Sequence, residues 1–339
     1  MGMTPHNSPT FNFMEKAASA RVIASGWIAQ NKEVEAFENE LCEFFDLPKG
    51  HAIAVSSGSA ALYLSLWVLD GHNKRIGLPV YACSALRNAI GLLNGRTVYF
   101  DCGADSPNIN VSIVNDADVD ILITPSMFGI PVDLTTKKKF RIIEDIAQSF
   151  GAISFGKRIG LRGDVGVCSF YATKMITSGG QGGAVISRDK TLIDKLKDYR
   201  EFDSRNDTQL RFNFQMTDLH AAIGRVQLKK LPSFIERREQ IFSIYASAGL
   251  NLLNNDSKDS ISVPYRAIVR CDNQKKLIQT LAEENFQAIV PIKDWELLDD
   301  FKKYPIAYKL AHQAVSLPIY PSLLKSDAKK IANIAKSFR

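Results

Sequence analysis

The chain has 339 residues, 45% hydrophobic and 23% charged, with a net charge of +6 at pH 7, and this balance excludes a largely disordered protein. No apolar run is long enough to span a bilayer, and the N-terminal residues lack the basic and apolar segments of a secretory signal, so we expect a cytoplasmic protein with no membrane partner. The basic residues are dispersed apart from Lys137, Lys138 and Lys139, which we assign to a solvated turn, so no nucleic-acid partner is expected.

An amphipathic helix is predicted near the N-terminus, because Val34, Phe37, Leu41 and Phe45 recur at helical spacing. The loop before it carries Trp27, which either anchors the packing of this region or contacts a substrate. Both roles stay open on the sequence alone.

A strand, a small polar turn and a helix follow directly. The sequence predicts a buried strand over 53–55, a turn over 56–59 and an apolar helix over 60–69. Free backbone N–H groups and the positive end of the helix dipole at such a junction make a binding site for an anion. The alternative is a plain capped helix without a ligand.

The next segments continue this alternation of strands and helices. Strands are predicted over 75–79, 97–101, 121–124 and 141–144, and a helix over 84–93. This order indicates an α/β fold with a largely parallel sheet. Ligands of such sheets bind beyond the carboxyl ends of the strands, where the turn over 57–59, Asp145 and the loop around Lys174 would meet.

Asp145 follows the last of these strands at once, and Gln148 lies three residues later. An acid at a strand end with a polar side chain beside it suits the recognition of a protonated ring nitrogen and a ring hydroxyl. The alternative is that Asp145 caps a helix.

The stretch from 163 to 183 contains a short apolar strand, a polar loop with Lys174 and a glycine cluster at positions 179, 180, 182 and 183. Ser169 precedes the lysine by five residues. Glycines let the backbone approach a ligand closely, and a lysine held there can form a Schiff base with a carbonyl compound. The alternative is a solvated lysine in a loop between two strands.

The remaining chain is predicted to form a strand over 184–187, a helix over 192–199 and helices over 218–229 and 234–245, with a break at Pro232 between the last two. Beyond residue 246 strand-like and helical segments alternate in a small α+β domain. We therefore expect a large domain over residues 1–240 and a small domain over residues 241–339. The five cysteines show no paired spacing and the five histidines no metal-binding spacing, so we predict no metal site.

The segments SGWIAQNKEVEAFE, AVSSGSAALYLSL, IIEDIAQSFGA, GDVGVCSFYATK, GGQGGAVISRD and FNFQMTDLHAAIGRVQLKKLPSFIERR carry a resemblance. In their order and residues they resemble the DegT/DnrJ/EryC1/StrS (sugar) aminotransferases of the fold-type-I pyridoxal-phosphate enzymes. The resemblance covers most of residues 20–240 and is weak past residue 245. It implies a large domain with a mostly parallel sheet between helices, a smaller C-terminal domain, and pyridoxal 5′-phosphate as cofactor.

The resemblance also implies roles for single residues. Lys174 matches the lysine that bonds to the cofactor aldehyde, Asp145 the aspartate that pairs with the pyridinium nitrogen, and Gln148 the residue near the 3-hydroxyl group. In chemical terms, a carboxylate beside the ring favours its protonated form, and a lysine amine can move a proton between substrate and cofactor carbons.

The phosphate group has its own matching residues. Gly58, Ser59 and Ser169 match the residues that cradle the phosphate. Asn213 matches an asparagine that reaches the phosphate bound by the neighbouring subunit, so the resemblance implies a homodimer with shared active sites.

The implied reaction moves an amino group, from L-glutamate, to a keto sugar that carries a nucleotide. Two alternatives are a cofactor-dependent sugar dehydratase, whose family members have histidine in place of Lys174, and a non-catalytic regulatory member of the family. The chain departs from the family pattern at Cys83, Ser126, Gln181 and Gln215, where an aromatic, a histidine, a glutamate and an arginine are frequent. These departures leave the identity of the sugar open.

Overall fold

The computed structural model of the chain describes residues 2–114, 117–135, 139–254 and 259–338. Two residues of the basic run, Lys137 and Lys138, lie outside the described residues, and Lys139 is exposed. No helix within the described ranges is long and apolar enough to cross a membrane.

A seven-stranded sheet forms the centre of the molecule, in the order β1-β9-β8-β5-β4-β2-β3. Its strands are β1 (Ala52–Val55), β2 (Arg75–Pro79), β3 (Arg96–Phe100), β4 (Ile121–Pro125), β5 (Arg141–Asp145), β8 (Val165–Ser169) and β9 (Gly183–Ile186). β9 pairs antiparallel with β1 and with β8, and the other pairs are parallel. The predicted α/β fold with a mostly parallel sheet is therefore confirmed.

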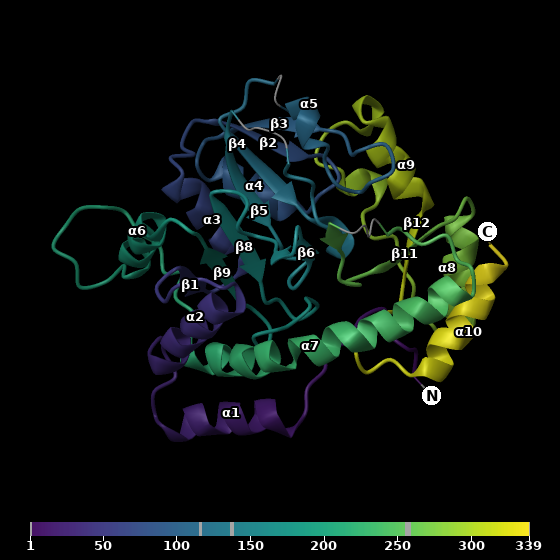
Figure 1. Cartoon of the computed structure of the whole chain (residues 1–339), viewed down its shortest axis with the longest axis horizontal. Helices are drawn as coiled ribbons and strands as arrows, with labels where there is room; N and C mark the ends of the chain where they lie inside the picture. Colours follow the sequence, from purple (N-terminus) through teal and green to yellow (C-terminus); the bar gives the residue numbers. More distant parts are fainter. Residues whose placement is uncertain (1, 115–116, 136–138, 255–258, 339) are drawn as a thin grey trace.

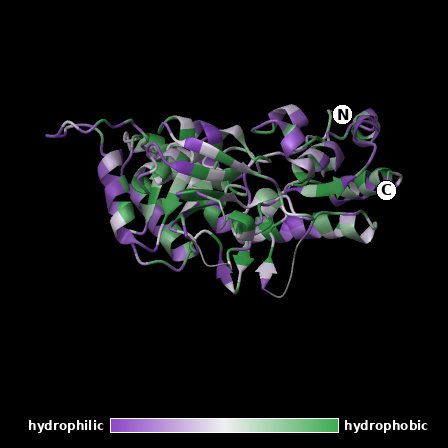
Figure 2. Cartoon of the chain, turned by 90° about the horizontal axis from the view of Figure 1, so that it is seen from above, coloured by the Kyte–Doolittle hydropathy of each residue, from purple (hydrophilic) through white to green (hydrophobic). Residues whose placement is uncertain are grey.

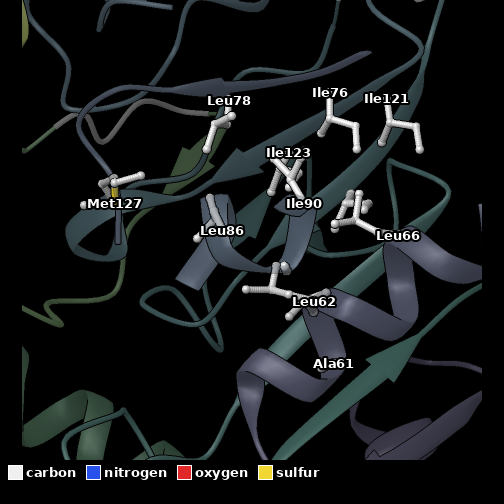
Figure 3. Packing of buried hydrophobic residues seen from close by; sticks show 14 of the residues in the cluster. Ala61, Leu62, Leu66, Ile76, Leu78, Leu86, Ile90, Ile121, Ile123 and Met127 are labelled. Carbon is white, nitrogen blue, oxygen red and sulfur yellow. The ribbon is translucent and has the colours of Figure 1, made fainter. Parts of the chain in front are cut away.

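Helices cover both faces of this sheet because successive strand residues point to opposite sides. Ile53 and Val55 of β1 belong to one hydrophobic core, whereas Ala52 and Ala54 belong to another. The first core contains α3 (Gly58–Val68), α4 (Ser84–Gly91) and α6 (Lys190–Arg200), and the second contains α2 (Lys32–Phe44) and the first half of α7 (Asp218–Ser247). Figure 3 shows side chains of α3 and α4 meeting those of β2 and β4.

One continuous helix, α7, runs from beneath the sheet to the C-terminal elements (Figure 1). The predicted break at Pro232 is wrong, because the helix passes through the proline. Proline removes one backbone hydrogen bond, but packing holds the helix on both sides of it. Leu231 and Phe234 are buried in the second core, and Ile241 and Tyr245 are buried in a third core.

A further helix that the sequence analysis did not expect, α1 (Phe13–Ala24), lies along α7. Ala18 and Val22 of α1 pack against Ala222 of α7. Asn12 caps the start of α1 and forms a reciprocal pair of hydrogen bonds with Glu15. Such a capping box is a local signal that fixes where a helix begins.

The C-terminal part contains strands and helices, as expected. Its elements are β11 (Ala267–Arg270), α8 (Gln274–Glu283), α9 (Pro305–Gln313), β12 (Ala314–Leu317) and α10 (Lys325–Lys336). β11 and β12 pair antiparallel, and with α8, α10 and the end of α7 they enclose the third core. Figure 2 shows hydrophobic residues along the central strands and hydrophilic residues toward the periphery. The division of domains at residues 240 and 241 stays a prediction.

The remaining elements are short. They are α5 (Val111–Val114), β6 (Ile153–Ser154), β7 (Lys157–Arg158) and β10 (Ser260–Ile261), with 3-10 turns over Met127–Gly129, Asp294–Glu296 and Phe301–Lys303. β10, β6 and β7 form a small antiparallel sheet in that order. β10 thereby pairs a segment of the C-terminal part with β6, which lies between β5 and β8 along the chain.

Candidate active site

A cavity of about 330 Å³ opens at the carboxyl ends of β4, β5 and β8, and the start of α3 forms another part of its wall. The structure brings six of the seven predicted site residues into its lining: Gly58, Ser59, Asp145, Gln148, Ser169 and Lys174. The position agrees with the rule for ligands of open α/β sheets. Residues from separate strands and loops therefore share one site, at the strand ends where the sequence predicted that they would meet.

The start of α3 forms a cradle suited to an anion. The hydroxyl of Ser57 accepts a hydrogen bond from the N–H of Ala60 at 3.1 Å, so Ser57 caps the helix. The N–H groups of Gly58 and Ser59 in the first turn have no acceptor within the helix, and the dipole adds positive potential there. A Cβ built on Gly58 would lie 2.8 Å from the Cβ of Ser169, so glycine lets the buried Ser169 hydroxyl approach this cradle.

Asp145 is the last residue of β5, and its side chain is buried. One carboxylate oxygen accepts a hydrogen bond from the N–H of Ala147 at 2.9 Å. Burial raises the pKa of Asp145, and the Ala147 hydrogen bond and the positive charge of Lys174 oppose that rise. A cationic donor placed opposite the buried carboxylate, on the cavity side, would stabilise its ionised form.

Gln148 lines the cavity, and its side-chain amide is held at both ends. Its Oε1 accepts a hydrogen bond from the N–H of Phe128 at 2.9 Å, and its Nε2 lies 3.7 Å from the sulfur of Met127. Because a backbone N–H can only donate, this contact fixes which end of the amide is the oxygen. The amide nitrogen lies toward Met127, another residue that lines the cavity.

Lys174 stands in the loop between β8 and β9, and the loop starts and ends at the same edge of the sheet. The backbone N–H of Lys174 donates to the carbonyl of Tyr171 at 3.0 Å. The N–H of Ala172 donates to the carbonyl of Gly180 at 3.1 Å. These bonds fold the loop back on the glycine cluster, where Gly179 and Gly180 have positive φ values of +81° and +138° that favour glycine. Ser169, where β8 ends, pairs with Gly183, where β9 begins.

Tyr171 is a lining residue that the sequence analysis missed. It contributes the one aromatic ring among the described residues that line the cavity, and it is exposed. Its place between Ser169 and Lys174 was the available signal. The rest of the apolar lining is aliphatic, with Leu62, Leu86 and Val167. Cys83, the position at which the sequence departs from a frequent aromatic residue, also lines the cavity.

Asn213 does not line the cavity of its own chain. It is exposed, and its Oδ1 accepts a hydrogen bond from the N–H of Gln215 at 3.0 Å. The Gln215 side chain in turn donates to Glu201 at 3.5 Å. Of the other departures from the family pattern, Ser126 and Gln181 line the cavity with Cys83. The Ser126 hydroxyl accepts a hydrogen bond from a backbone N–H at 3.2 Å, so it also holds its own loop.

Comparisons with known proteins agree on one family. The sequence model of the DegT/DnrJ/EryC1/StrS aminotransferase family matches residues 12–336. The chain is similar to the GDP-perosamine synthase of Vibrio cholerae, with 26% identity over 99% of both chains. It is 30% identical to the UDP-4-amino-4,6-dideoxy-N-acetyl-beta-L-altrosamine transaminase of Campylobacter jejuni, over 68% of this chain and 64% of the relative. The crystal structure of the aminotransferase TlmJ from Streptoalloteichus hindustanus has the same fold, with a TM-score of 0.92, 24% identity and coverage of 99% and 98% of the two chains.

Proposed function

Because this chain belongs to the DegT/DnrJ/EryC1/StrS aminotransferase family, we propose that it binds pyridoxal 5′-phosphate in the cavity and transfers an amino group to a keto sugar linked to a nucleotide. L-glutamate is the proposed amino donor. The observation that carries the proposal is that Asp145, at the end of β5, lines one cavity with Ser169 and Lys174, which lie at and just beyond the end of β8.

The residues present fit this cofactor. The phosphate would bind the N–H groups of Gly58 and Ser59 and the hydroxyl of Ser169, where the close approach at Gly58 leaves no room for a Cβ. The buried Asp145 carboxylate would pair with the ring nitrogen, and Gln148 would donate to the ring oxygen. When bound, pyridoxal phosphate supplies an aldehyde that receives the amino group and a ring that accepts electrons.

The chain's own residues account for the steps of proton transfer. Lys174 would hold the cofactor through its amine and, once released, would move a proton at the carbon that gains or loses nitrogen. Asp145 would keep the ring nitrogen protonated, because its negative charge in a buried place favours a positive charge opposite it. The cavity walls around both residues reduce the access of water and strengthen these charge interactions.

The substrate class is inferred from the relatives. The two relatives described above are named for a GDP-linked and a UDP-linked sugar, and the net charge of +6 suits an anionic substrate. Since the nucleotides of the two relatives differ, the proposal names a nucleotide-linked keto sugar without a base. Lys174 disfavours the dehydratase alternative, whose family members have histidine there. The complete set of Lys174, Asp145 and Ser169 disfavours a non-catalytic member.

We further propose a homodimer whose sites are shared. Figure 1 shows the loop between α6 and α7 projecting from the body of the molecule. In that loop Leu210 is 88% exposed and Phe212 is 64% exposed, next to Asn213. Large exposed apolar side chains beside a polar residue suit burial against a partner chain. The loop would place Asn213 at the phosphate of the partner's cofactor.

Mixed dimers test the shared site. An inactive Lys174→Ala chain and an inactive Asn213→Ala chain, mixed under conditions that exchange subunits, should regain part of the activity, because one of the two sites in each hybrid is intact. Exchange is verified with a mass tag on one chain. Proven exchange without any recovery would contradict shared sites.

The reaction is tested in two halves. Borohydride reduction of the protein loaded with pyridoxal phosphate should fix the cofactor to the peptide that contains Lys174, and label on another lysine would refute its role. L-glutamate alone should convert the cofactor without further turnover, and a keto nucleotide-sugar should then restore it and yield an amino sugar. Restoration by simple keto acids but by no keto sugar would refute the proposed substrate class.

A further inference from the structure

A segment from the C-terminal part of the chain, Val263 to Tyr265, packs beside the cavity. The N–H of Val263 donates to the carbonyl of Gly129 at 3.1 Å, in the turn that follows β4. Gly129 has a φ of +96°, and a Cβ there would lie 1.7 Å from the Val263 carbonyl oxygen. Only glycine permits this approach, so the segment is seated closely against the turn that carries Met127 and Phe128.

A buried guanidinium fixes the same segment from the other side. Arg238 of α7 donates to the carbonyls of Tyr265 at 3.1 Å, Pro264 at 3.4 Å and Ile319 at 2.8 Å. Burial lowers the pKa of Arg238 to about 10. These contacts hold the backbone of Tyr265 firmly, so its ring has a fixed place.

The fixed ring lies next to Lys174. The Lys174 Nζ is 5.6 Å from the centroid of the Tyr265 ring, and the Arg266 guanidinium is 5.4 Å from the same centroid. Tyr265 is only 3% exposed and shares a side-chain hydrogen bond with Thr173. A cation within about 6 Å of an aromatic face is attracted to it, most strongly where water is excluded.

The N-terminal arm supports the same loop. The side-chain amide of Asn7 donates to the carbonyl of Thr173 at 2.9 Å. Thus the residue before Lys174 is held by Asn7 through its backbone and by Tyr265 through its side chain. The segments around Asn7 and Tyr265, which are distant in sequence, therefore both contact the residue before Lys174. Neither Asn7 nor Tyr265 is among the residues proposed to bind the cofactor.

We propose that Tyr265 is a positioning residue for Lys174. The face of the Tyr265 ring holds the free amine of Lys174 beside the cavity, and the Tyr265 phenol interacts with the charge of that amine. This inference rests on the role proposed above for Lys174. A lysine side chain has four flexible bonds and loses about 2 kcal/mol of rotamer freedom when it is fixed, so an amine that is repeatedly released needs a defined resting place.

The charges around Tyr265 agree with this role. Burial acts to raise the pKa of Tyr265, but the positive charges of Lys174, Arg266 and Arg238 and the Thr173 hydrogen bond outweigh burial, so the pKa lies below its ordinary value. His6, which contacts Arg266, has a pKa lowered to about 3 by burial and therefore adds no charge near neutral pH. The buried Tyr245, without such cations, has a raised pKa.

The first test uses the cofactor-free protein. Phenolate absorbance is followed during titration with alkali, and the contribution of Tyr265 is the difference between the wild type and Tyr265→Phe. We expect that phenol to titrate below 10.0. In a Lys174→Met background, the midpoint of the Tyr265 titration should rise by about one pH unit, because a nearby positive charge has been removed. An unchanged midpoint in that background would overturn the proposal.

A matched control is Tyr320→Phe, which removes another buried phenol from the third core. Its contribution should titrate above 10.0, since burial raises the pKa of Tyr320, and Lys174→Met should leave it where it is. An equal shift of both phenols would show a general loosening of the protein rather than contact between Tyr265 and Lys174, and would also overturn the proposal.

The second test measures how fast Lys174 captures pyridoxal phosphate, with borohydride trapping and peptide mass spectrometry as readout. Tyr265→Leu, which lacks the ring, should slow capture by about tenfold, whereas Tyr265→Phe, which keeps it, should change the rate less than about threefold. Capture by Tyr265→Leu at the wild-type rate would refute the holding role. A wild-type protein that never traps the cofactor at Lys174 would instead refute the proposed function, and the phenol titration would still decide whether the two side chains interact.

Discussion

The substitution Gly58→Ala tests the phosphate cradle with a single methyl group. The added Cβ would lie 2.8 Å from the Cβ of Ser169 and 2.9 Å from its Oγ. Carbon atoms in favourable contact are about 3.5–4.0 Å apart, so one side must move by about 1 Å. Ser169 is buried and is paired with Gly183 in the sheet, so it cannot turn aside freely.

Overpacking of this kind costs about 1–3 kcal/mol. Where the strain displaces the Ser169 hydroxyl and the first turn of α3 from the phosphate, the same free energy appears as a loss of affinity. We therefore expect Gly58→Ala to weaken the binding of pyridoxal phosphate by about tenfold to a hundredfold, since each 1.4 kcal/mol is a factor of ten. The assay is a titration of cofactor-free protein with pyridoxal phosphate, followed by absorbance.

Gly91→Ala is the control, because Gly91 is also helical and a Cβ there meets nothing within 4 Å. It should bind the cofactor as the wild type does. Adding Ser169→Gly to Gly58→Ala removes the clashing atoms and should restore the free energy of unfolding of the cofactor-free protein, though not the affinity. Equal cofactor affinity in Gly58→Ala and Gly91→Ala would refute the cradle as described.

Three more predictions follow from single contacts. Asp145→Ala should still bind the cofactor through Lys174 and the phosphate cradle, but single-turnover kinetics should show proton transfer slowed by at least about a hundredfold, and near-normal rates would contradict its role. The buried carboxylate of Asp218 accepts hydrogen bonds from the N–H groups of residues 31, 33 and 34 at the start of α2. Asp218→Ala should therefore lower the free energy of unfolding, measured in urea, by about 2–3 kcal/mol. The control Asp189→Ala, which removes an exposed helix cap, should lower it by less. The pKa of His6 is lowered from 6.5 to about 3 in the folded chain, so the unfolded chain binds more protons at pH values between these two. The free energy of unfolding should therefore fall as the pH drops below 6.5. His6→Asn should lessen that fall in urea unfolding curves measured across this pH range.

The sequence was most informative where a local pattern and the fold agree. Strand ends that are followed by polar residues predicted a site at one edge of the sheet, and Asp145 and Lys174 both line the cavity found there. The helical spacing of apolar residues and the polar turn before the apolar run over 60–69 also located α2 and α3 within a few residues. Parallel sheets bring such strand ends together regardless of the exact register, so this part of the prediction needs little tertiary detail.

The sequence failed where distant packing decides the outcome. Pro232 predicts a break by its backbone chemistry, but Leu231 and Phe234 are buried on either side of it and keep α7 continuous. Tyr265 reaches Lys174 only because Gly129 and Arg238 seat its segment, contacts that join residues far apart in the chain. Neither the local propensity nor the spacing of Tyr265 contains this information.

The buried cores of the molecule cross the domain boundary that the sequence pattern predicts near residue 240. Val263 and Tyr265 complete the second core, and Leu253, Ile268 and Leu310 contribute to the first. An expression fragment that ends at residue 240 would lack these side chains and leave hydrophobic gaps in both cores of the sheet. We expect such a fragment to be recovered from inclusion bodies rather than as a folded cofactor-binding unit, so truncation studies should use the full chain and replace single residues instead.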